Sequence, residues 1–224
     1  MRAIKQLTQK IPQPKVGGSG EDSQGQSLAD LVRRGSASAR DMSERVEDVL
    51  SKSRASGVYP SFKLAGHLRT VSQLIQADLG IRVFYVELGG DGFGGFDNHA
   101  NQRDNHAAWL REMSASLAAF VDDLGQPELL ERVLLMTFSE FGRTVTESGR
   151  RGTNHGAAAP SFLVGGGLKG GLCGEHPDLT DLNQDAPNAT IDFRRLYATV
   201  LQNWLRFDAT SVLGSEYKTL DVFA

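Results

Sequence analysis

The stretch "IRVFYVELGGDGFGGFDNHANQRDNHAAWLREM" (Ile81–Met113) determines the fold class predicted for this chain. Its first part, Ile81–Leu88, is almost continuously apolar and rich in β-branched and aromatic side chains, which is typical of a strand buried on both faces. A loop of glycine, aspartate and histidine follows, and apolar residues at helical spacing then predict a helix over Asp104–Asp123.

A second apolar run, "RVLLMTF" (Arg132–Phe138), follows that helix and predicts another buried strand. A strand, a helix and a strand in this order form a crossover unit, whose two strands are nearly always parallel. Ser161–Val164, within "PSFLVGG", predicts a third strand of the same sheet, and "DFRRLYATVLQNWL" predicts a helix capped by Asp192 or Thr190. The sequence therefore predicts an α/β fold, in which a parallel-containing sheet has flanking helices.

The chain before Ile81 has a different character. Residues 1–27 are rich in Gly, Pro, Ser and Gln and are predicted to be a flexible N-terminal segment. Residues 28–80 show helical spacing and predict a helical segment: two amphipathic helices broken near Gly35, then a third that Gly80 ends as a C-terminal cap. Residues 81–224 form the remaining predicted region.

Composition excludes several classes of function. The 224 residues are 40% apolar and 23% charged, and the net charge of −3 gives no strongly basic face for nucleic acid. No apolar run reaches the roughly 18–20 residues of a membrane helix, and the N-terminal sequence lacks the apolar centre of a signal peptide. The lone Cys173 excludes an internal disulfide and a thiolate metal cluster. No P-loop lysine pattern and no Gly-x-Ser-x-Gly elbow is present.

Polar segments follow each of the three predicted strands. In an open parallel sheet, ligands bind at the loops that leave the carboxyl ends of the strands. The three segments are "DGFGGFDNHANQ", "SEFGRTVTESGRRGTNHG" and "GGGLKGGLCGEHPDLTD". Because they bring carboxylate and imidazole groups to one predicted edge, they indicate a site for zinc or for a hard metal ion.

The candidate residues each have a functional and a structural interpretation. Asp97 and His99 are two apart, so in an extended backbone they project to the same side and can bind one ion, or they shape the loop through hydrogen bonds. Glu140 is a metal ligand or a general base, and Arg143 pairs with an anionic ester or with Glu140 itself. His155 has nearby glycines that allow a close backbone approach.

Four motifs in the same order resemble the family of unknown function numbered 1501, within the alkaline-phosphatase-like superfamily. They are "GGFDNHANQRDNHAAWLREM", "LLMTFSEFGRTV", "GTNHGAAAPSFLVGGGLKGGL" and "DFRRLYATVLQNWL". The resemblance covers about residues 81–224 and implies the C-terminal half of an alkaline-phosphatase-like fold. It also implies a metal-dependent hydrolase of phosphate or sulfate esters, with an anionic ester as substrate and zinc, calcium, magnesium or manganese as the divalent cofactor.

The resemblance also implies roles for particular residues. Asp97, His99 and His155 correspond to the ligands of one metal ion, and Glu140 corresponds to a carboxylate ligand of a second ion. Asn154 is the other candidate ligand of the second ion, but it stands where most relatives have an aspartate, so this position has lost a negative charge.

Two departures from the superfamily pattern leave an alternative function open. Phe141 stands where relatives carry a histidine ligand, so we expect at most one metal ion to bind well. The nucleophile and the first metal-binding aspartate of the superfamily lie in an N-terminal half that this sequence does not show, and neither does it show the twin-arginine export signal frequent in relatives. The alternative is a truncated, non-catalytic family member that acts as a binding or structural protein. The sequence leaves the oligomeric state open.

Overall fold

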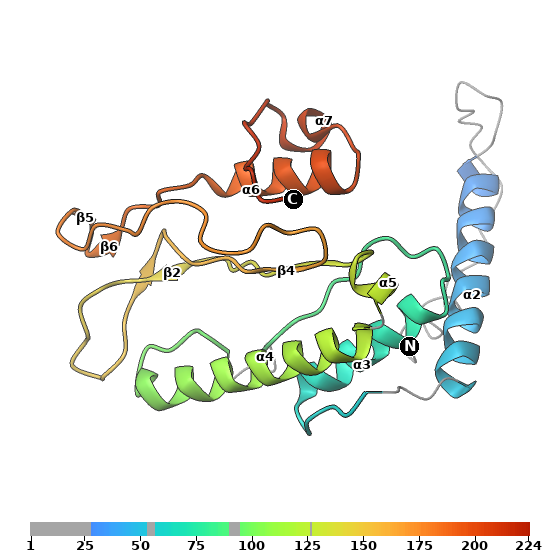
Figure 1. Cartoon of the computed structure of the whole chain (residues 1–224), viewed down its shortest axis with the longest axis horizontal. Coiled ribbons are helices and arrows are strands. Elements are labelled where there is room, and N and C mark those ends of the chain that lie inside the picture. The colour runs from blue at the N-terminus through green and yellow to red at the C-terminus, as the bar shows by residue number, and fades with distance from the viewer. Residues whose placement is uncertain (1–27, 53–56, 90–94, 126) are drawn as a thin grey trace. The chain divides into compact units, whose positions relative to one another are not determined.

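The computed structural model describes residues 28–52, 57–89, 95–125 and 127–224 (Figure 1). The chain divides into two compact units. The described part of the smaller unit comprises residues 28–52 and 73–82, and that of the larger unit comprises residues 57–72, 83–89, 95–125 and 127–224. The segment predicted to be flexible, residues 1–27, lies outside the described residues.

The smaller unit contains one long helix, α2 (Leu28–Lys52). The predicted break near Gly35 is wrong, because the helix continues through this glycine. Gly35 is exposed, and a glycine in an exposed helix interior costs only about 1 kcal/mol relative to alanine, which the rest of a long helix can offset. An ion pair of 2.6 Å between Lys52 and Asp48, at i,i+4 spacing, supports the last turn.

The main core of the larger unit lies between α4 (Gln102–Leu124) and the part of α3 (Lys63–Gln76) that belongs to this unit. The predicted helix over Asp104–Asp123 is confirmed, and so is the burial of the predicted apolar face of α3. The buried side chains are Leu64, Ala65 and Leu68 from α3, and Ala119, Phe120 and Leu124 from α4. Gly80 has the left-handed φ of 74° expected of a cap, but α3 ends four residues earlier.

In the described part of the larger unit, the strands are short and form three antiparallel pairs. β1 (Leu134–Met136) pairs with β4 (Leu163–Gly165), and both fall within or beside the predicted strands Arg132–Phe138 and Ser161–Val164. The remaining elements are β2 (Gly142–Arg143) with β3 (His155–Gly156), and β5 (Leu182–Asn183) with β6 (Ala186–Pro187).

The predicted strand Ile81–Glu87 is wrong, because the structure describes this segment as irregular chain. Val83 and Tyr85 are 70% and 72% exposed, whereas Phe84 and Val86 are half-buried. One face of the segment is thus open to solvent, although its continuous apolar character predicted burial on both. It lies beside the end of β1, where the rings of Tyr85 and Phe138 have centroids 6.0 Å apart. The described strands form antiparallel pairs, so a parallel-containing sheet, and the alkaline-phosphatase-like half-fold with it, stays a prediction.

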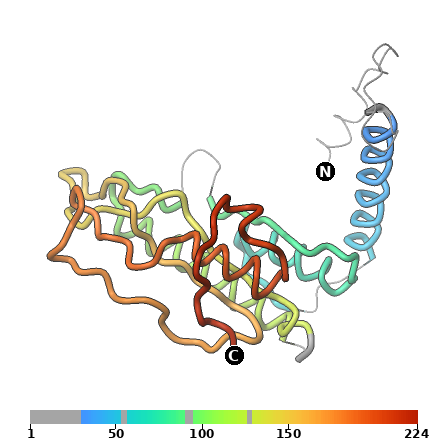
Figure 2. Tube along the Cα trace, turned by 90° about the horizontal axis from the view of Figure 1, so that it is seen from above, coloured from blue at the N-terminus to red at the C-terminus, as the bar shows by residue number. Residues whose placement is uncertain are grey.

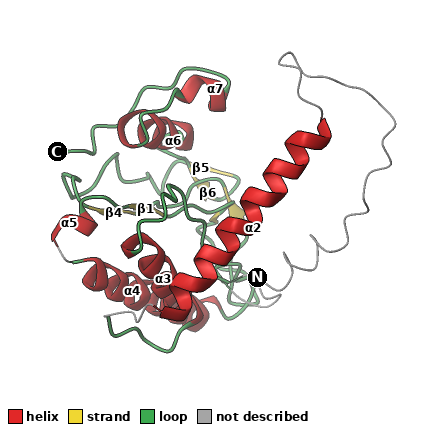
Figure 3. Cartoon of the chain, turned by 90° about the vertical axis from the view of Figure 1, so that its right-hand side faces the viewer, coloured by secondary structure: helices red, strands yellow, loops and turns green. Residues whose placement is uncertain are grey.

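Helices lie on both sides of the strands in the larger unit (Figures 1 and 3). α4 lies on one side, and α6 (Phe193–Thr199) and α7 (Ala209–Leu213) lie on the other. In Figure 2, viewed from above, the red C-terminal helices accordingly lie in front of the green α4. Asp192 caps α6 by accepting a hydrogen bond of 2.9 Å from the Arg194 amide, as predicted. A π-helical turn, Val200–Trp204, extends α6.

Candidate metal centre

The loop before α4 is tied by backbone hydrogen bonds to the loop before β3. The amide of Asn101 donates to the Arg150 carbonyl at 3.2 Å, and that of Gln102 donates to the Arg151 carbonyl at 2.8 Å. The Thr153 amide donates to the carbonyl of Asn98, in the first loop, at 3.3 Å. These contacts hold two segments about fifty residues apart in sequence side by side, so that His99 comes close to β3.

Gly152 allows this approach because it has no side chain. A Cβ atom there would lie 2.2 Å from the carbonyl carbon of His99 and 2.5 Å from the Ala100 amide nitrogen. Backbone therefore packs directly on backbone. The glycines near His155 were expected to permit a close approach, and the structure shows that Gly152 receives the backbone of His99.

The β2–β3 pair places Arg143 and His155 directly opposite each other. Opposite residues in an antiparallel pair project to the same face, so the guanidinium and the imidazole share a face. Arg143 donates from Nη1 to Asp97 Oδ1 at 3.1 Å and from Nε to Thr153 Oγ1 at 3.0 Å. Its side chain is 15% exposed, and its Nη2 atom is buried without a hydrogen-bond partner in the described part of the chain.

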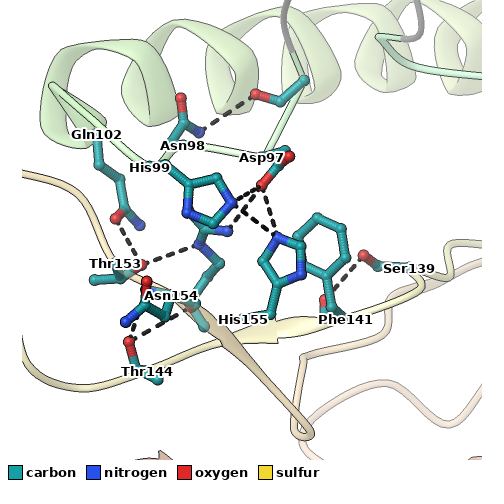
Figure 4. A network of polar contacts seen from close by, with 12 residues as sticks. Asp97, Asn98, His99, Gln102, Ser139, Phe141, Thr144, Thr153, Asn154 and His155 are labelled. Atoms are coloured by element: carbon teal, nitrogen blue, oxygen red, sulfur yellow. Dashed lines mark hydrogen bonds and ion pairs between the residues drawn. The ribbon is translucent and has the colours of Figure 1, made fainter.

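Asp97, His99 and His155 converge at one point (Figure 4). Asp97 Oδ1 lies 2.9 Å from His99 Nε2 and 2.8 Å from His155 Nε2, and the two Nε2 atoms are 3.1 Å apart. Around a tetrahedral zinc ion with bonds of about 2.0–2.1 Å, ligand atoms lie about 3.3 Å apart. The three atoms therefore need to move apart by only a few tenths of an ångström to share an ion. The convergence predicted from sequence is met.

The three side chains are accessible to solvent, with exposed fractions of 49% for Asp97, 46% for His99 and 47% for His155. The hydrogen bond with His155 is the main cause that holds the pKa of the Asp97 carboxyl below its usual value. The charge of His99 and the hydrogen bond from Arg143 act in the same direction. The carboxylate is thus ionised at neutral pH and presents its charge at the surface.

An aromatic ring supports one side of the cluster. The ring of Phe141 is stacked on the imidazole of His155, with centroids 3.8 Å apart and planes 4° from parallel. Sequence reasoning treated Phe141 only as a missing ligand and did not foresee this contact. No spacing rule signals it, because the two rings meet only when β2 and β3 pair.

Glu140 and Asn154 do not join the three convergent side chains. Glu140 is exposed and lies outside the group whose ligand atoms meet. The backbone of Asn154 is held by β2's neighbour Thr144: the Asn154 amide donates a hydrogen bond to Thr144 Oγ1 at 2.9 Å. Because neighbouring residues of an extended chain project to opposite faces, its side chain points away from that of His155, as Figure 4 shows.

The third polar segment leaves the opposite end of the β1–β4 ladder. β4 runs antiparallel to β1, and the Gly166 amide that follows β4 donates to the carbonyl of Leu130, which precedes β1, at 3.0 Å. The prediction that three segments meet at one edge is therefore wrong for this segment. Its histidine, His176, is exposed, with Nδ1 3.0 Å from the carbonyl oxygen of Pro177.

Comparison with known protein families shows to which family this chain belongs. Residues 27–215 match the family described as a protein of unknown function, DUF1501. The chain belongs to the DUF1501 family. The DUF1501 match begins well upstream of residue 81, so it includes α2 and α3 together with the three convergent side chains. No curated protein and no solved structure matches the chain. None of the helices that the structure describes combines the length and apolar character needed to cross a membrane.

Proposed function

We propose that this DUF1501 chain binds one divalent cation through Asp97, His99 and His155 and that the loaded site acts on phosphate or sulfate esters. The observation that carries the proposal is the convergence of two imidazole nitrogens and one carboxylate oxygen at an accessible surface. Imidazole donors suit zinc, whereas calcium and magnesium prefer oxygen ligands. Zinc is therefore the best match among the four candidate ions.

Three protein ligands are the number found in catalytic zinc sites, which keep a further position for water or substrate. A bound ion at such a site polarises an ester oxygen or lowers the pKa of a bound water. The chain's own contribution is to orient the ligands. Arg143 holds Asp97 through Nη1 and is itself held by Thr153, and the exposure of both histidines leaves the approach open to an anionic ester.

The ligand set also supports a relationship with the alkaline-phosphatase-like superfamily. An aspartate and a histidine two residues apart, joined by a later histidine, are the ligands that the sequence resemblance implied for one ion. In that relationship Glu140 and Asn154 would serve a second ion, and Arg143 would hold the anion. The first two lie outside the convergent group, and Arg143 already donates to Asp97 and Thr153.

Binding without turnover is the second candidate function. It is favoured because Glu140 and Asn154 lie outside the convergent group. A two-metal centre needs ligands for two ions about 3.5–4 Å apart. Here the described residues supply one group of three ligands. Two hydroxyls in the surrounding network are already engaged, since Ser139 donates to the Phe141 carbonyl and Thr153 to Gln102 Oε1. This chain alone would then bind the ion and a partner or ligand but turn over esters slowly.

Activity assays on the purified full chain separate the two candidates. Hydrolysis of p-nitrophenyl phosphate and p-nitrophenyl sulfate is measured with zinc or manganese added, for the wild type, His155→Ala and the control Asn154→Ala. Turnover that depends on the ion and is lost only in His155→Ala supports the hydrolase. Ion binding without turnover supports the second candidate, and absence of ion binding contradicts both.

A further inference from the structure

Phe141 contacts two of the three groups that surround Asp97. Its ring lies parallel to the His155 imidazole at 3.8 Å, and its centroid is 5.7 Å from the guanidinium carbon of Arg143. The backbone of Phe141 is fixed as well, because its carbonyl accepts a hydrogen bond of 3.0 Å from Ser139 Oγ. One aromatic side chain thus connects the two cross-strand partners of the β2–β3 pair to each other.

The stack with Phe141 bears on the direction of the His155 ring. The His155 side chain is about half exposed on a strand of two residues. Asp97 and His99 contact it at Nε2, and the His99 ring is tilted against it with centroids 4.9 Å apart, whereas Phe141 is stacked parallel on its face. The torsion that rotates an imidazole about its Cβ–Cγ bond has broad minima, so an unsupported ring samples many planes. The lone pair of Nε2 lies in the ring plane, and an ion can be bound well only if it lies in that plane too. A parallel ring at stacking distance limits the plane that His155 adopts.

The stack also favours the ion-bound state over the free state. An imidazole that binds a cation takes on part of its positive charge. The face of a phenyl ring is negative and attracts a positive group above it. The attraction between Phe141 and His155 is therefore stronger when the imidazole binds an ion than when it is free and neutral.

We infer that Phe141 is a positioning residue, which holds the His155 ring in the plane where Nε2 meets an ion shared with Asp97 and His99. The inference rests on the proposed ion binding. It assigns Phe141 a function that is independent of its inability to coordinate metal. The aromatic ring is the essential feature, so another aromatic residue should replace it and an aliphatic residue of similar size should not.

Zinc and cobalt affinities of the purified full chain test this, measured by competition with a chromophoric chelator. Phe141→Leu removes the ring and should weaken both affinities about tenfold or more, the size of effect that supporting groups have on metal ligands. Phe141→Tyr keeps the ring and should retain the wild-type affinity. Phe138→Leu is the matched control, because Phe138 is an exposed phenylalanine whose ring lies beside Tyr85 instead of His155. Phe141→Met replaces Phe141→Leu if the leucine variant does not fold.

Nitrogen chemical shifts of His155 provide a second readout, which a merely structural role would not change. In zinc-loaded wild type and Phe141→Tyr, the His155 Nε2 signal should show full coordination. In the aliphatic variant at the same zinc concentration, it should show partial coordination, while circular dichroism shows an unchanged fold. Equal affinity and equal shifts in wild type and the aliphatic variant would overturn the inference and leave the proposed ion site intact. A wild type that binds neither ion would overturn the proposed function itself, and the inference with it.

Discussion

Two aspartates of the larger unit, Asp123 and Asp97, show how differently one side chain is used. Asp123 is 4% exposed at the end of α4 and accepts hydrogen bonds from Tyr59 Oη at 2.9 Å and Ser72 Oγ at 2.6 Å. The Asp97 side chain is 49% exposed and lies among two imidazoles and a guanidinium. The first joins three segments of the core, and the second presents a charged oxygen to solvent.

The difference separates a structural carboxylate from a proposed metal ligand. Asp123 is enclosed so closely that a Cβ atom added to Gly57 would lie 2.8 Å from the Cβ atom of Asp123. Burial is the largest cause that raises the pKa of Tyr59 above its usual value, and the hydrogen bond with Asp123 is the next. Asp97 is surrounded instead by groups that themselves bind metals or anions. The partners and the exposure of a carboxylate, more than its presence in a polar loop, therefore indicate its role.

Asp123→Ala should have the largest effect on stability. It removes the acceptor of two hydroxyls, one of them fully buried, and each unsatisfied buried group costs about 1–3 kcal/mol. We expect a loss of about 3 kcal/mol in the free energy of unfolding, measured by urea denaturation. The neighbouring Asp122 is exposed, and Asp122→Ala should change this free energy by less than about 0.5 kcal/mol. Similar losses in both variants would contradict the structural role of the buried Asp123 carboxylate.

Gly152→Ala should damage the ligand cluster through the backbone. The new methyl group would overlap the His99 backbone, and overpacking of this kind costs about 1–3 kcal/mol. We expect zinc affinity to fall together with stability, since the two loops that hold His99 and His155 must separate. Gly149→Ala is the control, because a Cβ atom at Gly149 would meet nothing within 4 Å. Unchanged zinc affinity in Gly152→Ala would show that the loop contact does not set the site.

Tyr59→Phe should have an intermediate and pH-dependent effect. It removes one hydrogen bond to Asp123, so we expect a loss of about 1 kcal/mol at neutral pH. Because folding raises the pKa of Tyr59, its contribution is fully present below the pKa of an unfolded tyrosine, about 10, and is lost as pH rises above it. Wild-type stability should therefore fall above about pH 10 more steeply than that of Tyr59→Phe. Parallel pH profiles from denaturation at pH 7 to 11 would contradict this.

Asp97→Asn should have the smallest effect on the stability of the metal-free chain. The Asp97 carboxylate is 49% exposed, so solvent screens its ion pairs, and we expect a change of less than about 0.5 kcal/mol. The same substitution should abolish zinc binding, since it removes the charged oxygen of the ligand set. A loss of stability close to that of Asp123→Ala would mean that Asp97 is also a structural residue.

Sequence patterns predicted the features that depend on local spacing. The apolar period of Leu64 and Leu68 identified the buried face of α3, and Asp192 was one of two residues expected to cap α6. The two-residue spacing of Asp97 and His99 predicted that both side chains project to the same side, and both lie in the convergent cluster.

The features that sequence did not predict depend on how distant segments meet. An apolar run such as Ile81–Glu87 suits a strand, but it does not reveal that one of its faces is open to solvent. The antiparallel direction of β4 sends the third polar segment away from the site. The contacts of Phe141 with His155 and of Gly152 with the His99 backbone exist only after the segments pack, so no single-sequence spacing contains them.

The number of zinc ions bound per chain tests the central claim most directly. Isothermal titration of the purified, chelator-treated chain should give one tight site, lost in Asp97→Asn and His155→Ala. Asn154→Asp should leave the number and affinity unchanged, because that side chain points away from the cluster. Failure of the wild type to bind zinc, or two tightly held ions with affinity increased by Asn154→Asp, would contradict the proposed site of three ligands.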